Sequence, residues 1–272
     1  MEEEDEYTPG TKSFWVHFYS KDGGKLVEKE DHRCHSRKKE GVSLMDHYEW
    51  FLEYDDYEEA LMKFLQGAYT WVKKELRVLH VGCGNSNFCD FFPESLLGVK
   101  FEGKPVTCDI LNVDICENVI EHLVGLFPTR QYVIGDCCNL VLADESSKET
   151  SWYHCSGSPP FLRGVHGGSV DLVFDKGTLD ALLSAFPGEY NPNAEAYATE
   201  ALKCLATGGC IFIITINCID LVNTYLLSAS DGDRSFSFKY KTEIFITKDQ
   251  VGKLHVETLG QRYSCYGYVV TM

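Results

Sequence analysis

The feature that most constrains the fold is an apolar run that ends directly in a glycine turn. Residues 78–81 read Val-Leu-His-Val, and Gly82, Cys83 and Gly84 follow at once, ahead of the polar pair Asn85-Ser86. An apolar run of this kind is typical of a buried strand, and Asn or Ser can begin a helix. Glycine allows a sharp turn and lets the backbone approach a ligand closely. The order of strand, glycine turn and helix predicts the first unit of a doubly wound α/β sheet.

The glycine turn by itself is compatible with a plain strand-to-helix connection or with a nucleotide site. Dinucleotide-binding turns carry a third glycine (G-x-G-x-x-G), and Asn87 at that position argues against NAD or FAD. A second strand pattern ends in Asp114. A carboxylate there can accept hydrogen bonds from both ribose hydroxyls of a nucleoside. The spacing from Gly82 to Asp114 exceeds the usual ~20 residues, and we attribute the excess to an inserted loop at 100–105.

Apolar runs farther along the chain predict further strands of the same sheet. Strands are expected at 131–134, 170–174 and 210–216, and helices alternate with them. The nearly uninterrupted apolar run at 210–216 is typical of a strand that is buried on both faces. The first crossover helix is expected over 85–92, with its end near Pro93.

Length and composition favour one α/β domain, over 13–272, with inserted loops. Residues 1–12 are expected to be disordered. Their acidic start, Met1 to Glu6, is not that of a secretory signal, so none is expected. Charged or Ser/Gly/Pro-rich stretches predict insertions at about 20–43 and 142–169. No run approaches ~18 apolar residues, so no membrane span is expected.

The net charge of −16 disfavours a nucleic-acid partner, because a phosphate backbone would be repelled, and it is compatible with a basic protein substrate. Twelve cysteines are scattered without a paired C-x-x-C, which indicates reduced thiols in a cytoplasmic protein. His32, Cys34 and His35 lie close together, but no ligand pair at zinc spacing accompanies them. No metal site is predicted.

Three segments together resemble the class I S-adenosylmethionine-dependent methyltransferases. They are V-G-C-G-N-S at 81–86, V-D-I-C at 113–116 and F-D-K-G-T-L-D-A at 174–181. More narrowly, they are similar to the methyltransferase-like 13 group, several of whose members methylate lysines of translation elongation factor 1-alpha. The resemblance implies a doubly wound, seven-stranded, mostly parallel sheet, with 235–246 and 266–271 as antiparallel strands six and seven. It also implies S-adenosyl-L-methionine as cofactor and a protein-lysine substrate, with elongation factor 1-alpha as the expected partner.

The resemblance also implies a set of cofactor-binding residues. Trp15 and Tyr19, four apart on an expected helix, match an aromatic element that closes over the cofactor, and Trp50 matches a second aromatic position; ordinary core packing is the alternative for these side chains. Asp136 matches an acceptor for the adenine amino group, with a turn cap as the alternative. Lys176 matches a cofactor-side contact. The full set is Trp15, Tyr19, Trp50, Gly82, Gly84, Asp114, Ile115, Gly135, Asp136 and Lys176.

Asp175 is the candidate catalytic residue, because it ends the fourth strand, where doubly wound folds bind their ligands. A lysine amine must be neutral to attack a methyl group, and a carboxylate can orient or deprotonate it. Pairing with Lys176 or capping the next helix suits Asp175 equally well. Asp180 is expected one turn into that helix, as a cap. The chain lacks the N-P-P-[YF] segment of methyltransferases that act on nucleic-acid bases.

Other functions are compatible with the same motifs. One is methylation of a protein N-terminus or of a small molecule. Another is a non-catalytic binding protein with a methyltransferase fold. A nicotinamide dehydrogenase is disfavoured by Asn87 and by the absence of an obvious catalytic His or Tyr-x-x-x-Lys. Nothing in the sequence indicates the oligomeric state.

Overall fold

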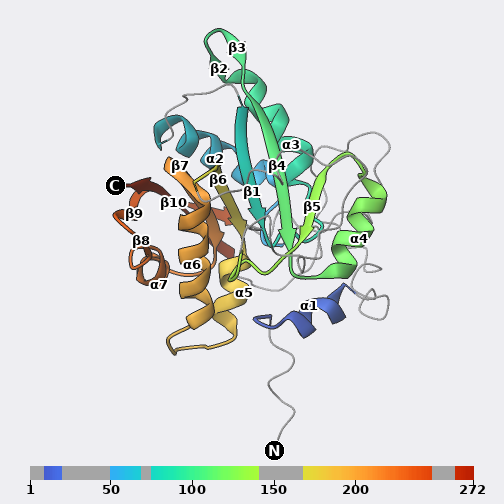
Figure 1. Ribbon diagram of the computed structural model, residues 1–272, viewed down its shortest axis with the longest axis vertical. Helices are drawn as coiled ribbons and strands as arrows, with labels where there is room; N and C mark the ends of the chain where they lie inside the picture. The colour runs from blue at the N-terminus through green and yellow to red at the C-terminus, as the bar shows by residue number, and fades with distance from the viewer. Residues whose placement is uncertain (1–8, 20–49, 69–74, 141–167, 247–260) are drawn as a thin grey trace, which may run out of the picture.

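The structure is a computed structural model, and it describes residues 9–19, 50–68, 75–140, 168–246 and 261–272 (Figure 1). Several sequence predictions concern residues outside these ranges. They are the disorder expected for 1–8, the insertion at 20–43, most of the insertion at 142–169, and the group His32, Cys34 and His35. Disorder was expected through residue 12, but Lys12 is the first residue of helix α1 (Lys12–Phe18). The hydroxyl of Thr11 caps this helix by accepting a hydrogen bond from the backbone of Phe14.

One sheet of eight strands forms the centre of the described structure, in the order β5-β4-β1-β6-β7-β10-β9-β8. The strands from β5 to β7 run parallel, whereas β10, β9 and β8 pair antiparallel. The seven expected strands are all present, and the two-residue β8 adds one more at the edge. Their bounds are β1 (Glu75–Val81), β4 (Thr107–Asp114), β5 (Gln131–Ile134), β6 (Val170–Lys176), β7 (Leu205–Thr215), β8 (Ser230–Asp231), β9 (Arg234–Ile246) and β10 (Gln261–Thr271).

Helices cover both faces of this sheet. One buried apolar cluster joins α2 (Tyr54–Ala68) and α3 (Phe88–Ser95) to one face. A second joins α5 (Thr178–Ser184), α6 (Pro192–Cys204) and α7 (Ile219–Leu226) to the other. Helix α4 (Glu117–Leu126) connects β4 to β5. None of the helices in the described ranges is both long and apolar enough to cross a bilayer.

The helix after the glycine turn differs from the expectation. Helix α3 begins at Phe88 rather than at residue 85, and Pro93 lies inside it rather than at its end. Proline lacks an N–H group and costs the helix one hydrogen bond. The helix has only eight residues and passes directly into the 3₁₀ turn η4 (Leu96–Gly98), so Pro93 stands close to its end.

The insertion expected at 100–105 forms a separate hairpin, β2 (Lys100–Phe101) with β3 (Lys104–Pro105). Its turn residues, Glu102 and Gly103, both have positive φ angles. This combination is typical of the tight turns that connect paired strands. The hairpin projects at the end of the sheet opposite α1 (Figure 1), so the insertion leaves the carboxyl ends of the parallel strands uncovered.

Helix α1 lies across those carboxyl ends (Figure 1). Its side chains Trp15, Val16 and Tyr19 pack against a buried cluster that includes Cys83 and Cys116. Trp15 and Tyr19 share one side of the helix, as expected, with ring centroids 6.2 Å apart. The N-terminal helix therefore covers the edge of the sheet where a doubly wound fold binds ligands.

Candidate active site

A cavity of about 290 Å³ lies at the carboxyl ends of the central strands. Strands β4 and β5 lie on one side of β1, and β6 and β7 lie on the other, so the cavity occupies the switch point of the sheet. All of the predicted cofactor-binding residues except Gly84 line it: Trp15, Tyr19, Trp50, Gly82, Asp114, Ile115, Gly135, Asp136 and Lys176. The structure thus brings together side chains that are as far as 161 positions apart in the chain.

The glycine turn has no room for side chains. Gly82 and Gly84 have φ angles of 54° and 48°, which L-residues rarely adopt. A Cβ at Gly82 would overlap the hydroxyl of Thr178, and a Cβ at Gly84 would lie 2.5 Å from the hydroxyl of Tyr19. Gly84 does not line the cavity, but it contacts a side chain that does. Both glycines are therefore required by the packing around the turn.

Asp114 fastens the glycine turn to strand β4. One carboxylate oxygen accepts a hydrogen bond from the backbone of Gly84 and the other from the backbone of Cys116, each at 2.8 Å. Burial raises the pKa of Asp114, and these hydrogen bonds oppose that shift. The backbone of Ile115 also donates to this carboxylate. A carboxylate has about four acceptor positions, so about one remains for a donor from a ligand. Asp114 lines the cavity and can supply it.

Four aromatic rings pack together beside the site, and three of them, Trp15, Tyr19 and Trp50, line the cavity. The ring of Trp50 lies 5.4 Å from that of Trp15 and 5.2 Å from that of Phe18. Tyr19 stacks on Trp15. The indole N–H of Trp15 donates to the carbonyl oxygen of Pro9 over 2.6 Å, which fixes the segment before α1. Helix α1 and the residues around Trp50 therefore form a single apolar cover.

Lys176 holds the backbone on either side of Phe51. Its ammonium donates to the carbonyl oxygen of Trp50 over 2.8 Å and to that of Leu52 over 3.2 Å. The backbone of Leu52 also donates to the carbonyl of Trp50, and Phe51 between them has a φ of 70°. These are the features of a γ-turn with a positive central φ, which is rare and strained. Lys176 lines the cavity, as predicted, and it also stabilises the turn that carries Trp50.

Asp175 is fully buried and does not line the cavity. Its carboxylate accepts hydrogen bonds from the backbone N–H groups of Thr178 and Leu179 and from the hydroxyl of Tyr197. Burial raises the pKa of Asp175 to about 7. It does not pair with Lys176, whose ammonium bonds to backbone carbonyls. This geometry corresponds to the helix-capping alternative, and the catalytic role stays a prediction.

Asp180 lies in the first turn of α5, and it also lines the cavity, which the sequence did not indicate. Its role as a helix cap stays a prediction. Its Oδ1 accepts three hydrogen bonds from the segment after β7: from the hydroxyl of Thr215, the backbone of Ile216 and the amide of Asn217. Its Oδ2 is sealed from solvent and has no partner among the described residues. Burial raises the pKa of Asp180 to about 6, which leaves it mostly ionised at neutral pH.

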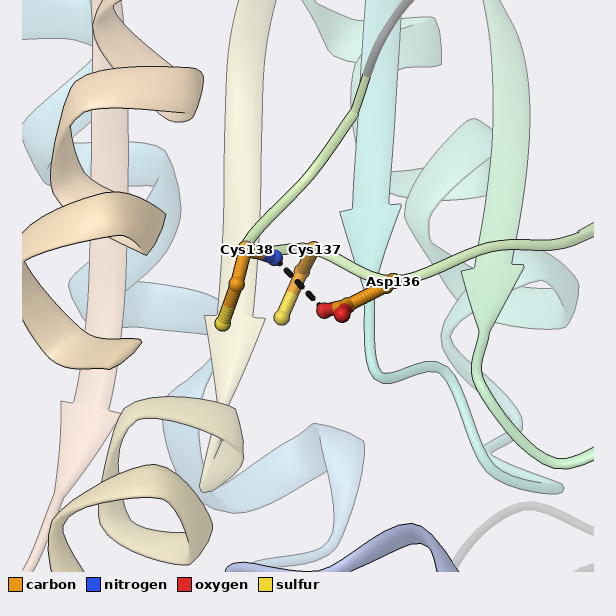
Figure 2. Close-up of side chains that lie close together, drawn as sticks. All are labelled: Asp136, Cys137 and Cys138. Carbon is orange, nitrogen blue, oxygen red and sulfur yellow. Dashed lines mark hydrogen bonds between the residues drawn. The ribbon is translucent and has the colours of Figure 1, made fainter. Parts of the chain in front are cut away.

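Asp136 lines the cavity beside two consecutive cysteines (Figure 2). Its carboxylate turns back to accept a hydrogen bond from the backbone of Cys138, so the turn-cap alternative is realised. The ligand atoms of Asp136, Cys137 and Cys138 lie within 4.8 Å of one another. A hydrogen bond with Cys138 and burial raise the pKa of the Cys137 thiol well above its usual range, and a protonated thiol is a poor metal ligand. The local turn accounts for this grouping.

The chain is similar in sequence to two named methyltransferases over part of its length. No protein-family model matches it. It is 27% identical over 151 residues to the human "Citrate synthase-lysine N-methyltransferase CSKMT, mitochondrial", which covers 55% of each chain. It is 27% identical over 169 residues to the "eEF1A lysine and N-terminal methyltransferase" of Danio rerio, covering 62% of this chain and 19% of that one. The chain therefore spans about half the length of the human relative.

Among solved structures, a "TehB-like SAM-dependent methyltransferase" from Corynebacterium glutamicum aligns over 80% of this chain and 88% of its own, at 11% identity and a TM-score of 0.42. The strand order and the cavity at the switch point are those of a doubly wound α/β fold, and both relatives are named as methyltransferases. The chain has the α/β fold typical of class I S-adenosylmethionine-dependent methyltransferases and is distantly similar to two lysine methyltransferases.

The residues around the cavity fit S-adenosylmethionine, the cofactor of class I methyltransferases. Gly82 and Gly84 form a close turn that any Cβ would obstruct. Asp114 offers an acceptor position at the end of the second parallel strand, where a ribose is bound. The aromatic cover of Trp15, Tyr19 and Trp50 lies over the same cavity. S-adenosylmethionine would thus be held between the glycine turn, Asp114 and helix α1.

Proposed function

We propose that the protein transfers a methyl group from S-adenosylmethionine to an amine of a protein substrate, first of all to a lysine side chain. The observation that carries the proposal is the cavity at the switch point, where Asp114 tethers the glycine turn and helix α1 forms the cover. Both relatives are named as lysine methyltransferases, one acting on citrate synthase and the other on eEF1A. Translation elongation factor 1-alpha is the first substrate to test, and citrate synthase is the second.

The chain's own residues meet the physical needs of such a transfer. When bound, S-adenosylmethionine supplies a methyl group on a positively charged sulfur, which a nucleophile displaces in line. The protein has to hold donor and acceptor in one orientation and exclude water. Asp114 and the glycine turn fix one end of the cavity, and the rings of Trp15 and Trp50 cover it.

The test is transfer of tritiated methyl from S-adenosylmethionine to purified elongation factor 1-alpha, to citrate synthase and to cell extract. We expect label on a protein lysine, located by peptide mass spectrometry. Asp114→Asn should abolish labelling because it removes an acceptor from the turn and from the ligand. Asp109→Asn, at the other end of the same strand, is the matched control and should label normally. If cofactor binds but wild-type protein labels nothing, the non-catalytic alternative replaces this proposal.

Methylation of a protein N-terminus is the second candidate. The relative from Danio rerio is named for both lysine and N-terminal methylation. A lysine side chain and a protein N-terminus both carry an amine that attacks the methyl group, so the same site could act on either. A substrate whose N-terminus is acetylated separates them: unchanged labelling favours lysine, and lost labelling favours the N-terminus.

A cytoplasmic location and a basic protein partner are also part of the proposal. The net charge of −16 favours contact with a basic surface over contact with nucleic acid. The human relative is named as mitochondrial, so location needs its own test. Fractionation of cells with an antibody to this chain would separate the two compartments.

A further inference from the structure

Strand β9 has a long outer edge. On its inner side it pairs with β10 from Ser235 to Ile246. On its outer side the short strand β8 reaches only Arg234 and Ser235. No other strand in the described ranges pairs with the remaining outer edge, at 236–246. This edge therefore presents a row of backbone N–H and C=O groups that a further strand can bind.

The side chains along this edge alternate between the two faces of the sheet. Tyr240 and Ile244 pack with the apolar cluster under α2, so Lys241 and Glu243 project from the opposite face. Lys241 lies 3.2 Å from the carboxylate of Glu243, and Arg262 of β10 also pairs with that carboxylate. The edge thus carries an apolar row on one face and a charged row on the other.

The sequence Tyr-Lys-Thr-Glu-Ile at 240–244 is complementary to itself. Two copies of the edge can pair antiparallel about a two-fold axis at Thr242. Lys241 then lies opposite the partner's Glu243 on one face, and Tyr240 lies opposite the partner's Ile244 on the other. Each of these pairs occurs twice, and Thr242 meets the partner's Thr242 on the axis. Opposite charges, an aromatic ring with a β-branched side chain, and two threonines are all cross-strand pairs that stabilise antiparallel sheets.

The charges on the edge also select this register. Side chains that lie directly opposite each other share a face of the sheet, so a two-fold axis has to pass through a residue. An axis at Lys241 would place two ammonium groups opposite each other, and an axis at Glu243 would place two carboxylates opposite each other. Both arrangements are destabilising. Lysines on an edge commonly prevent unwanted pairing, and here they leave the register at Thr242 open.

We propose that the outer edge of β9 is a dimer interface, at which two copies of this chain join through antiparallel pairing of residues 240–244. The same patch is used on both copies, as two-fold symmetry requires. The result is one continuous sheet that runs through both subunits. The inference concerns a surface outside the cavity and does not depend on the proposed function.

Helix α2 leaves room for this arrangement. The ring of Phe64 in α2 lies over Gly267 of β10, between its contacts with Phe212 of β7 and Tyr240 of β9. In the dimer the two β10 strands are three strand spacings apart, about 14 Å. Packed helices need only about 8–10 Å between their axes, so the two α2 helices do not collide. The two-fold axis reverses the strand directions, so the two cavities lie at opposite ends of the shared sheet.

Two charge reversals test the interface and its register. Lys241→Glu sets a carboxylate against the partner's Glu243, and Glu243→Lys sets an ammonium against the partner's Lys241. Each variant alone should dimerise at least about tenfold more weakly than wild type. When the two variants are mixed, opposite charges face each other again and a heterodimer should form. A variant that had merely lost its fold would not regain a partner on mixing.

Sedimentation velocity of the full chain measures the association, with a fluorescent label on Lys241→Glu to follow the heterodimer. We expect wild type to dimerise with a dissociation constant in the micromolar range, and Lys100→Glu, in the separate hairpin, to match it as the control. A wild-type protein that stays monomeric up to about 100 μM would overturn the inference. So would single variants that dimerise like wild type, or a mixture that forms no heterodimer.

The cavity gives an independent readout. Lys241 and Glu243 do not line it, so both variants should bind S-adenosylmethionine as wild type does. Absence of a dimer therefore leaves the proposed function intact, and absence of methyl transfer leaves the dimer intact.

Discussion

The ammonium of Lys176 donates a hydrogen bond to the carbonyl oxygen of Trp50 over 2.8 Å, across 126 positions of sequence. A second bond to Leu52 completes a clamp around Phe51, whose φ of 70° is uncommon for a residue with a side chain. Backbone strain of this kind costs about 1–3 kcal/mol and persists only where surrounding contacts impose it. The position of Trp50 in the cavity wall thus depends on Lys176.

Replacing Lys176 with methionine should weaken both the fold and the site. Methionine keeps the apolar stem but removes the donor of the Leu52 carbonyl, at about 1–3 kcal/mol, and leaves the Trp50 carbonyl only its bond from the backbone of Leu52. We expect a lower free energy of unfolding and weaker binding of S-adenosylmethionine, because Trp50 is released from the wall. Urea unfolding and calorimetry measure the two effects. Lys203→Met is the control: Lys203 pairs with Glu200 on the surface, and both values should stay near wild type.

Alanine at Gly84 should disturb the site through Tyr19. Gly84 and Gly103 both have positive φ, but only at Gly84 would a Cβ meet another side chain, the hydroxyl of Tyr19. Gly84→Ala should therefore reduce cofactor affinity, whereas Gly103→Ala should cost stability alone, about 1–2 kcal/mol. Removing the hydroxyl in the double variant Gly84→Ala, Tyr19→Phe should recover part of the affinity. Additive losses in that double variant would show that the two residues are not coupled.

The buried carboxyl of Asp175 should make stability depend on pH. Its pKa is raised to about 7 by burial, from an ordinary value of 3.8. Between these values the folded state holds a proton that the unfolded state releases, so the contribution of Asp175 to stability is largest at low pH and declines as pH rises toward 7. Urea unfolding of the wild type and of Asp175→Asn at several pH values isolates the contribution of Asp175 to the free energy of unfolding. The difference in unfolding free energy should change by up to about 1.4 kcal/mol per pH unit between pH 5 and 7. A constant difference would contradict the assignment.

Those parts of the fold that depend on local pattern were predictable from the sequence. The run at 78–81 with its glycines indicated β1 and its turn, and the spacing of Trp15 and Tyr19 indicated a shared helix side. Asp114 was recognisable because it ends an apolar strand. Each of these signals lies within a few residues of the feature that it predicts.

The remaining features depend on contacts between distant segments. Asp180 was interpreted as a cap because its partners, Thr215 and Asn217, come 35 or more positions later and reach it only when β6 pairs with β7. The clamp between Lys176 and Trp50 is hidden for the same reason. For Asp175 the sequence left capping and catalysis open, and only the bond with Tyr197 reveals how its carboxylate is occupied.

Titration of S-adenosylmethionine into the purified protein tests the central claim most directly. We expect wild-type protein and Asp109→Asn to bind it with a dissociation constant in the micromolar range, and NAD not to bind. In Asp114→Asn the affinity should fall by about tenfold or more, because a charge-assisted acceptor is lost. A wild-type protein that does not bind S-adenosylmethionine, or an Asp114→Asn variant that binds it as tightly as wild type, would contradict the account.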